Sequence, residues 1–313
     1  MNKLIEFLDE NNVQYAVGGN EHCRDGWVQI CCPFCISGDT DFHLGINLKN
    51  QYSSCYRCGW HSLESVIKAV TDAPYSEVKI IKAKLRGTAE IAVAKTISNK
   101  QFVLPSSASA SRIPGALNYI QSRFPDRSAL DVINKYDIRA TTWDYLFECA
   151  DGHKSGKYAS SIVIPHIVDS RAVSFQCKRY VGDVHGYMTA KQDEELIPCK
   201  SMLWGVDRVP YSAVVVVEGV MCAMTIGDGA VHTYGVGFTP NQVQELAVFD
   251  IVYVLYDKDD AGCEGYKRLK SVLGHRTKVA KVTLSSKTAN DPNDLLKHKE
   301  DWHEVEEIRG LVN

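Results

Sequence analysis

The chain has 313 residues, of which 45% are hydrophobic and 23% charged, and a formal net charge of −3. This composition is typical of a soluble globular protein with room for two or three domains, and no overall field draws it to nucleic acid, although a local basic stripe still can. No apolar run approaches the roughly 18 residues that a membrane helix needs, so we expect a cytoplasmic protein without a membrane span.

The first twelve residues, MNKLIEFLDENN, predict an amphipathic helix, because acids interrupt the short apolar pattern that a signal peptide would require. The chain contains eleven cysteines, an odd number. In a cytosolic protein such a count favours metal ligands and free thiols over a disulfide framework.

Two Cys-x-x-Cys pairs follow, Cys32/Cys35 and Cys55/Cys58. Two intervening residues allow both sulfurs of a pair to point at one centre, and four thiolates at about 2.3 Å make a closed structural zinc site. The stretch between the pairs has strand character, which suits a zinc ribbon. The alternative is two pairs of ordinary buried cysteines.

Other residues near the pairs are weaker candidates. Cys31 and Cys23 compete for a ligand position, but Cys31 has the wrong spacing. With four cysteines present, the nearby histidines are redundant as ligands and are interpreted as surface or nucleic-acid contacts: His22, His43 and His61. Further side chains offer an aromatic and basic surface, or pack within a small domain: Trp27, Tyr52, Tyr56, Arg57 and Trp60.

A short helix is predicted after the second pair, with Leu63, Val66, Ile67 and Val70 on one face. A basic segment follows at 78–100, and the small residues of 104–115 read as a linker. A helical pattern then leads into SIVIPHIVDSRAVSFQCKRY, which predicts a hairpin with strands on both sides of Asp169 and Ser170.

After residue 211 the pattern alternates between strands and helices. The strands expected are AVVVVE, AVHTYGV, DIVYVLYD and TKVAKVTL, and the helices include one capped by Thr239 and Pro240 and one ended by Gly274. Near-continuous apolar strands that alternate with helices predict a parallel sheet covered on both faces.

Carboxylates follow three of these strands. Glu218 ends the first, Asp257 and Asp259 follow another, and Asp291 and Asp294 come after the last. Groups that follow the carboxyl ends of strands in an open α/β sheet gather at one edge, where ligands bind. Bare carboxylates that close would repel one another, so we expect Mg²⁺ or Mn²⁺ there, with Gly219 and Gly262 allowing tight turns. The alternative for any single pair is a helix cap or a solvated turn.

These residues resemble the Toprim domain, and with the zinc ribbon upstream the chain is similar to DnaG-type DNA primases, closest in organisation to stand-alone bacteriophage primases. The resemblance implies that Glu218, Asp257, Asp259 and Asp291 are catalytic metal ligands. It also implies that Lys178, Arg179 and Lys200 bind the nucleotide triphosphate or the template. Two positions depart from the family pattern, because Cys222 and Asn293 stand where an Asp is common, and this puts a second metal ion in doubt.

The fold class expected is α/β, with an N-terminal zinc ribbon, a mixed α+β part of a primase core and a Toprim parallel-sheet domain. The expected boundaries are a zinc-binding domain at 1–70, a basic linker at 71–113, the N-terminal part of the RNA polymerase core at 114–210, the Toprim domain at 211–298 and a tail at 299–313.

The function implied is synthesis of short RNA primers on single-stranded DNA from ribonucleoside triphosphates, with structural Zn²⁺ and catalytic Mg²⁺ or Mn²⁺. A replicative helicase on a separate chain is an expected partner, which could be joined by a single-stranded DNA-binding protein. If the chain is phage-encoded, it acts in the bacterial host cytoplasm. Two alternatives remain: a Toprim-type metal-dependent nuclease, and a non-catalytic zinc/Toprim DNA-binding module.

Overall fold

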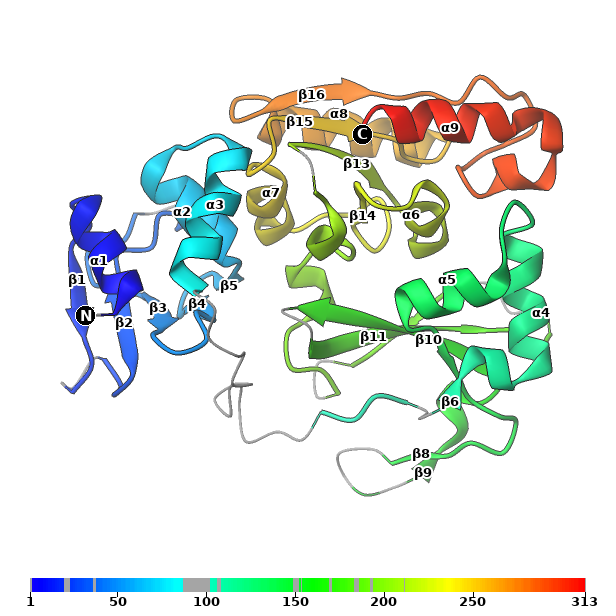
Figure 1. Ribbon diagram of the computed structural model, residues 1–313, viewed down its shortest axis with the longest axis horizontal. Coiled ribbons are helices and arrows are strands. Elements are labelled where there is room, and N and C mark those ends of the chain that lie inside the picture. The colour runs from blue at the N-terminus through cyan, green and yellow to red at the C-terminus, as the bar shows by residue number, and fades with distance from the viewer. Residues whose placement is uncertain are drawn as a thin grey trace.

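Figure 1 shows a computed structural model with three units, an N-terminal one in blue, a middle one in green and a C-terminal one in yellow to red. The structure describes residues 2–19, 23–35, 38–86, 102–105, 108–148, 152, 154–168, 171–182, 186–191, 194–210 and 212–312. Each unit is built around its own sheet, and the sequence prediction of a mixed α/β chain with a parallel sheet at the C-terminal end is confirmed.

The N-terminal unit is an antiparallel five-stranded sheet in the order β1-β2-β3-β4-β5, preceded by α1 (Lys3–Glu10). Its strands are β1 (Tyr15–Val17), β2 (Trp27–Ile30), β3 (Leu44–Asn47), β4 (Ser53–Cys55) and β5 (Gly59–His61). The predicted helix after the second cysteine pair is α2 (Leu63–Thr71), whose N-terminus is capped by the side chain of Ser62. Leu63, Val66 and Ile67 are buried as the helical spacing predicts, whereas Val70 is half-buried.

The segment expected to be a linker begins with a helix, α3 (Tyr75–Arg86). Val78 and Leu85 are buried in the same apolar cluster as α1 and α2, and Lys82 pairs with Glu64 of α2. Apolar residues at helical spacing therefore draw this part of the basic segment into the N-terminal unit. The rest of that segment, with Lys95 and Lys100, lies outside the described residues.

The middle unit is a second antiparallel sheet, in the order β12-β11-β10-β7-β6. Its elements are β6 (Ala108–Ser109), α4 (Pro114–Arg123), α5 (Ala129–Tyr136), β7 (Arg139–Ala140), β10 (Ser161–Val168), β11 (Arg171–Arg179) and β12 (Met188–Thr189), beside a small pair formed by β8 (Phe147–Glu148) and β9 (Lys154–Ser155). The predicted hairpin is β10 and β11, although its turn, Asp169 and Ser170, lies outside the described residues. The expected linker thus also contributes β6 to this sheet.

The C-terminal unit is a parallel sheet in the order β14-β13-β15-β16. Its elements are β13 (Ala213–Val217), α6 (Val220–Ile226), β14 (Ala230–His232), α7 (Pro240–Leu246), β15 (Ile251–Val254), α8 (Asp260–Leu273), β16 (Lys278–Lys281) and α9 (Trp302–Gly310). The predicted cap of α7 is present, because Thr239 and Gln242 form a capping box ahead of Pro240.

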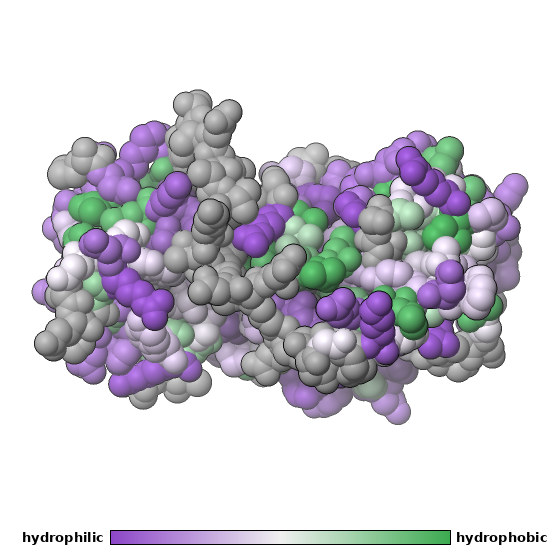
Figure 2. Space-filling model, turned by 90° about the horizontal axis from the view of Figure 1, so that it is seen from below, coloured by the Kyte–Doolittle hydropathy of each residue, from purple (hydrophilic) through white to green (hydrophobic). Residues whose placement is uncertain are grey.

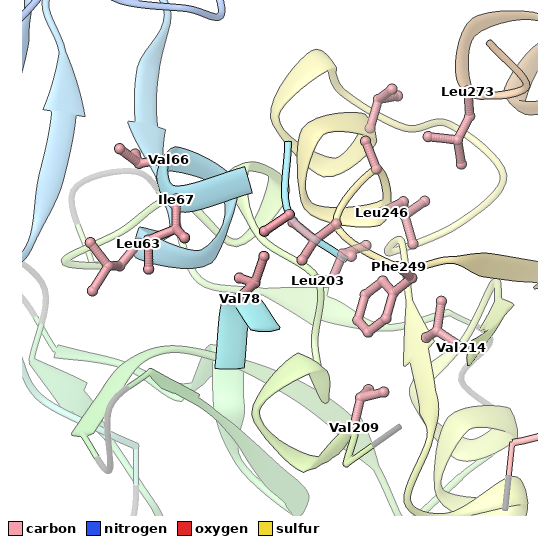
Figure 3. Packing of buried hydrophobic residues seen from close by; sticks show 14 of the residues in the cluster. Leu63, Val66, Ile67, Val78, Leu203, Val209, Val214, Leu246, Phe249 and Leu273 are labelled. Carbon is pink, nitrogen blue, oxygen red and sulfur yellow. The ribbon is translucent and has the colours of Figure 1, made fainter. Parts of the chain in front are cut away.

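The valine run of β13 serves two apolar cores, since successive side chains of a strand point to opposite faces. Val214 and Val216 face a core shared with α7, α8 and the N-terminal unit, whereas Val215 and Val217 face a core shared with α6, α9, α4 and α5. Figure 3 shows side chains of α2 and α3 packed toward Leu246 and Phe249 in the first core. The central strand therefore holds all three units together.

The expected tail is part of the second core. Residues 302–310 form α9, and Val305, Ile308 and Val312 are buried against α6 and its neighbours. Apolar residues three and four apart place this helix on the sheet in spite of its many acids.

The surface seen from below Figure 1 is mostly polar. Figure 2 shows hydrophilic side chains spread over this face and apolar ones in small separate patches. In the part of the chain that the structure describes, every helix is too short or too polar to cross a membrane.

Candidate active site and metal centre

The four predicted cysteines come together at one point of the N-terminal unit. The ligand atoms of Cys32, Cys35, Cys55 and Cys58 all lie within 4.8 Å of one another. The Sγ–Sγ distances are 3.5 Å for Cys32 and Cys58, 3.7 Å for Cys35 and Cys55, and 3.8 Å for Cys35 and Cys58. A tetrahedron with Zn–S bonds of about 2.3 Å has edges of about 3.8 Å, so the sulfurs fit a structural zinc ion.

The chemistry of these sulfurs also fits a cation. Burial raises the pKa of the Cys32 thiol to about 12 and raises the pKa of Cys58 still further, so without a cation both would be neutral. A bound cation reverses this balance by stabilising thiolates. The four-cysteine cluster therefore fits a structural zinc site.

Neighbouring side chains shape the loop around the cluster. Partial burial would raise the pKa of Asp39, but hydrogen bonds from the N–H groups of Cys32, Asp41 and His43 lower it to about 2. The prediction that His61 is a surface or nucleic-acid contact is wrong, because His61 is 2% exposed, stacks on Phe34 and places Nε2 3.0 Å from Cys58 Sγ. His22 lies outside the described residues.

The aromatic residues near the cluster divide between packing and surface. Trp60 is buried, and Trp27 packs edge-on against Tyr52. Tyr56, between Cys55 and Cys58, is 73% exposed. Tyr56 is thus the one of these three with a ring largely open to solvent.

The predicted carboxylates gather at the carboxyl ends of the parallel strands. Glu218 follows β13 and Asp257 follows β15, and the backbone N–H of Asp257 donates a hydrogen bond of 3.1 Å to Glu218 Oε1. Asp259 is the N-cap of α8 and accepts a hydrogen bond from the N–H of Gly262, while Asp291 Oδ1 accepts one from the N–H of Asp294. Asp259 and Asp291 therefore also perform the local roles that were weighed as alternatives.

The carboxylates are close enough to disturb one another. Burial raises the pKa of Asp257 to about 7, with further upward contributions from Glu218, Asp291 and Asp259. Burial likewise raises the pKa of Glu218, helped by Asp259 and Asp291. An edge of oxygen donors that repel one another fits a hard divalent cation such as Mg²⁺ or Mn²⁺.

The two glycines expected beside this edge differ. A Cβ at Gly262 would lie 2.2 Å from the carbonyl oxygen of Asp257, so only glycine fits there. A Cβ at Gly219 would meet nothing within 4 Å, and its φ of −122° suits any residue. The expectation that Gly219 is needed for a tight turn is therefore wrong.

The two positions that depart from the family pattern are structural. Asn293 is 2% exposed, and its Nδ2 donates to the carbonyl of Arg123 and to Thr225 Oγ1, both at 2.9 Å. Cys222 is 6% exposed on α6. Asp294 is engaged as well, because Lys297 lies 2.5 Å from its Oδ1 and the N–H of Asn290 donates to its Oδ2.

The predicted basic residues come from the middle unit and the segment after it. Lys178 and Arg179 end β11, and Lys178 Nζ donates to the carbonyl of Gly186 and lies over the ring of Tyr187. Lys200 is exposed, and its Nζ donates to the carbonyl of Tyr234 at 2.6 Å. Tyr234 follows β14, which is next to β13 in the sheet, so Lys200 is tied to the edge that carries Glu218.

Sequence reasoning missed Arg123, at the end of α4. Its positive charge lowers the pKa of Asp294, after the larger effects of burial and Lys297, and also lowers that of Tyr187. Its buried Nε has no hydrogen-bond partner among the described residues. Nothing local in YIQSRF distinguishes this arginine, because the packing of α4 against the C-terminal unit is what brings it there.

The sequence of the parallel-sheet unit matches a known family. Residues 215–296 match the model of the Toprim-like family. These residues form a Toprim-like domain. Its strands β13 to β16 and its three acidic positions all fall within the matched range.

Solved structures with the same fold extend this result to the other units. The zinc-binding and RNA polymerase domains of the Aquifex aeolicus primase align with 99% of this chain and 83% of that one, at 18% identity and a TM-score of 0.54. The E. coli primase catalytic core aligns with 62% of this chain and 72% of that one, at 19% identity and a TM-score of 0.48. A search of curated proteins gave no match. The resemblance to DnaG-type primases is confirmed as a likeness of fold.

Proposed function

We propose that this protein is a DNA primase that makes short RNA primers on a single-stranded DNA template by metal-dependent nucleotidyl transfer. The observation that carries the proposal is the gathering of Glu218, Asp257, Asp259 and Asp291 at one edge of the Toprim-like sheet, where they raise the pKa of Asp257 to about 7. The fold shared with the Aquifex aeolicus primase over nearly the whole chain supports it.

The reaction joins a 3′ hydroxyl to an incoming ribonucleoside triphosphate. A bond forms between the hydroxyl oxygen and the α-phosphorus, the bond from the α-phosphorus to the bridging oxygen breaks, and pyrophosphate leaves while the hydroxyl proton passes to a base. Mg²⁺ or Mn²⁺ held by the four carboxylates would neutralise phosphate charge and favour ionisation of the hydroxyl. Glu218 is a candidate for either a ligand or the base.

The basic residues of the site would bind the triphosphate. Lys178, Arg179 and Lys200 carry positive charge and lie on the middle unit or just after it, so they can hold phosphates in place while the carboxylates act from the other unit. Phosphoryl transfer depends mainly on such positioning and charge neutralisation. Arg123 adds a fourth positive charge near Asp294.

The N-terminal unit would read the template. The exposed ring of Tyr56 beside the cysteine cluster is available to stack on an unpaired base. The zinc ion would be structural, and a replicative helicase on a separate chain would recruit the protein to single-stranded DNA.

The proposal is tested by incorporation of labelled ribonucleotides on single-stranded DNA with Mg²⁺ or Mn²⁺, with and without replicative helicase. Short RNA products are expected from the wild type and none from Asp257→Ala. Asp260→Ala is the matched control, because Asp260 is exposed one residue past Asp259 and is expected to leave synthesis intact. Metal-dependent cleavage of the template without RNA products would instead indicate a nuclease, and absence of both would indicate a non-catalytic binding module.

A further inference from the structure

Tyr234 has a backbone conformation that a tyrosine rarely adopts. It follows β14 directly, and its φ is +62°, in the left-handed region that favours glycine. A bulky side chain there is strained, and such a conformation persists only where the surroundings impose it. Strained residues concentrate at functional sites, so the contacts of Tyr234 indicate what the strain is for.

Two histidines hold Tyr234 in this conformation. Its N–H donates to His232 Nδ1 at 3.0 Å, and its hydroxyl is hydrogen-bonded to Nδ1 of His166. Its ring stacks on that of His166, with centroids 5.8 Å apart and planes 17° apart, and lies 4.3 Å from that of His232.

His166 belongs to the other unit of the site. It is 1% exposed on β10 of the middle sheet, at the point where the pairing of β10 with β11 shifts register. A bulge of this kind redirects a side chain. The Tyr234 hydroxyl therefore joins the Toprim-like domain to the middle unit through a buried partner.

The carbonyl of Tyr234 is directed at Lys200. Lys200 Nζ donates to this oxygen at 2.6 Å and lies 6.0 Å from the centre of the Tyr234 ring, and the carbonyl of Lys200 accepts a hydrogen bond from Thr239 Oγ1 at 2.7 Å. On the other side of Tyr234, the N–H of Gly235 donates to the carbonyl of Glu218 at 2.8 Å. One turn thus contacts both the exposed lysine and the backbone of a predicted metal ligand.

We propose that Tyr234 is a positioning residue for Lys200, which it holds beside the carboxylate edge so that the ammonium group can bind the triphosphate of the incoming ribonucleotide. This inference rests on the proposed primase function. An ammonium group has three N–H donors, of which the Tyr234 carbonyl takes one and leaves two for phosphate oxygens. An extended conformation at 234 would turn the carbonyl away and leave a long, flexible side chain to find the phosphates by itself.

The test is a double-mutant cycle between Tyr234→Phe and Lys200→Ala. Tyr234→Phe keeps the ring but removes the hydroxyl that binds His166. We expect the KM for ribonucleotides to rise about fivefold, as the loss of one hydrogen bond would give, with kcat little changed. In the Lys200→Ala background the same substitution should have no further effect, because Tyr234 acts through Lys200.

Two further variants separate positioning from general stability. His166→Phe removes the same hydrogen bond from the other side and should reproduce the effect, also in case Tyr234→Phe does not fold. Tyr158→Phe is the matched control, because it removes another buried hydroxyl, which donates to Glu194 at 2.6 Å in the middle unit. It is expected to leave the KM unchanged.

The outcomes distinguish this proposal from the proposed function. A wild type that makes no primers, with or without helicase, would refute the primase and this inference with it. A wild type that does make primers leaves the primase standing, and the positioning role is then refuted by an unchanged KM in Tyr234→Phe and His166→Phe. It is also refuted if the effects of Tyr234→Phe and Lys200→Ala multiply, since independent effects mean that Tyr234 does not act through the lysine.

Discussion

The backbone N–H of Asp257 donates a hydrogen bond to Glu218 Oε1 and so holds the ends of β13 and β15 together where their carboxylates meet. The same contact keeps two acids close in a half-buried site, and burial and then Glu218 raise the pKa of Asp257 to about 7. The edge is thus arranged for a cation at some cost in stability when no cation is bound.

Asp257→Asn should make the metal-free protein more stable while abolishing primer synthesis. At pH 8 the substitution removes one of several carboxylates that repel one another, so we expect a gain on the order of 1 kcal/mol in the free energy of unfolding in EDTA. Below about pH 6 the gain should vanish, because Asp257 is then protonated. Asp260→Asn, at an exposed position, is the control, and a metal-free variant less stable than the wild type would contradict the argument.

Cys35→Ser should remove the metal of the N-terminal unit. The wild type is expected to release about one zinc ion per chain on denaturation, and the variant almost none, because a closed tetrahedral site needs all four ligands. Because α2 and α3 share a core with α7 and β13, the melting temperature of the whole chain should fall as well. Cys31→Ser changes a cysteine outside the cluster and should keep the zinc, which colorimetric titration would show.

Glu245→Gln should change how stability depends on pH. Glu245 lies on α7, where its Oε1 accepts hydrogen bonds from Ser65 Oγ at 2.8 Å and from the N–H of Ser62 at 3.3 Å, both in the N-terminal unit. Burial raises its pKa to about 7, so the folded protein favours the protonated form. The associated stability is fully present below the unfolded pKa of 4.5 and is lost as the pH rises through 7.

Denaturant titrations between pH 5 and pH 8 would measure this effect. The wild type should lose up to about 3 kcal/mol relative to Glu245→Gln over this range. Glu307→Gln, at an exposed position of α9, should follow the wild type. Parallel pH profiles for the wild type and Glu245→Gln would show that this carboxyl does not control the docking of the N-terminal unit.

Asn293→Ala should destabilise the protein by about 2 kcal/mol, because it leaves the buried Thr225 hydroxyl and the carbonyl of Arg123 without their common donor. Thermal unfolding would measure the loss. Asn290→Ala is the neighbouring control, since the side chain of Asn290 is exposed. An effect below about 0.5 kcal/mol would show that Asn293 does not tie the Toprim-like domain to α4.

Tyr56→Ala tests the division of labour between the units. Removing residues 1–70 would expose the apolar core that α2 shares with α7, so a single exposed side chain is the better probe. We expect the rate of initiation at preferred template sites to fall about tenfold through the loss of base stacking. Extension of a preformed RNA primer, the internal control, should be unaffected, and equal loss of both would refute a template-reading role.

The sequence by itself determined the local features of this protein. The spacing of Cys32, Cys35, Cys55 and Cys58 places four sulfurs around one centre, because each pair is clamped by its own short turn. The order of apolar strands and helices likewise predicted the parallel sheet, since continuous valine runs require burial on both faces. The position of Glu218 at a strand end followed from the same rule.

Only the tertiary structure decided how the units meet. The apolar spacing of α3 and α9 was visible in the sequence, but a linker and a tail show the same charged composition until a partner surface is known. The roles of Asn293, Arg123 and Tyr234 depend on atoms that are distant along the chain, such as Thr225 for Asn293 and His166 for Tyr234. Local patterns specify which element forms, whereas long-range packing determines which side chains from different elements meet.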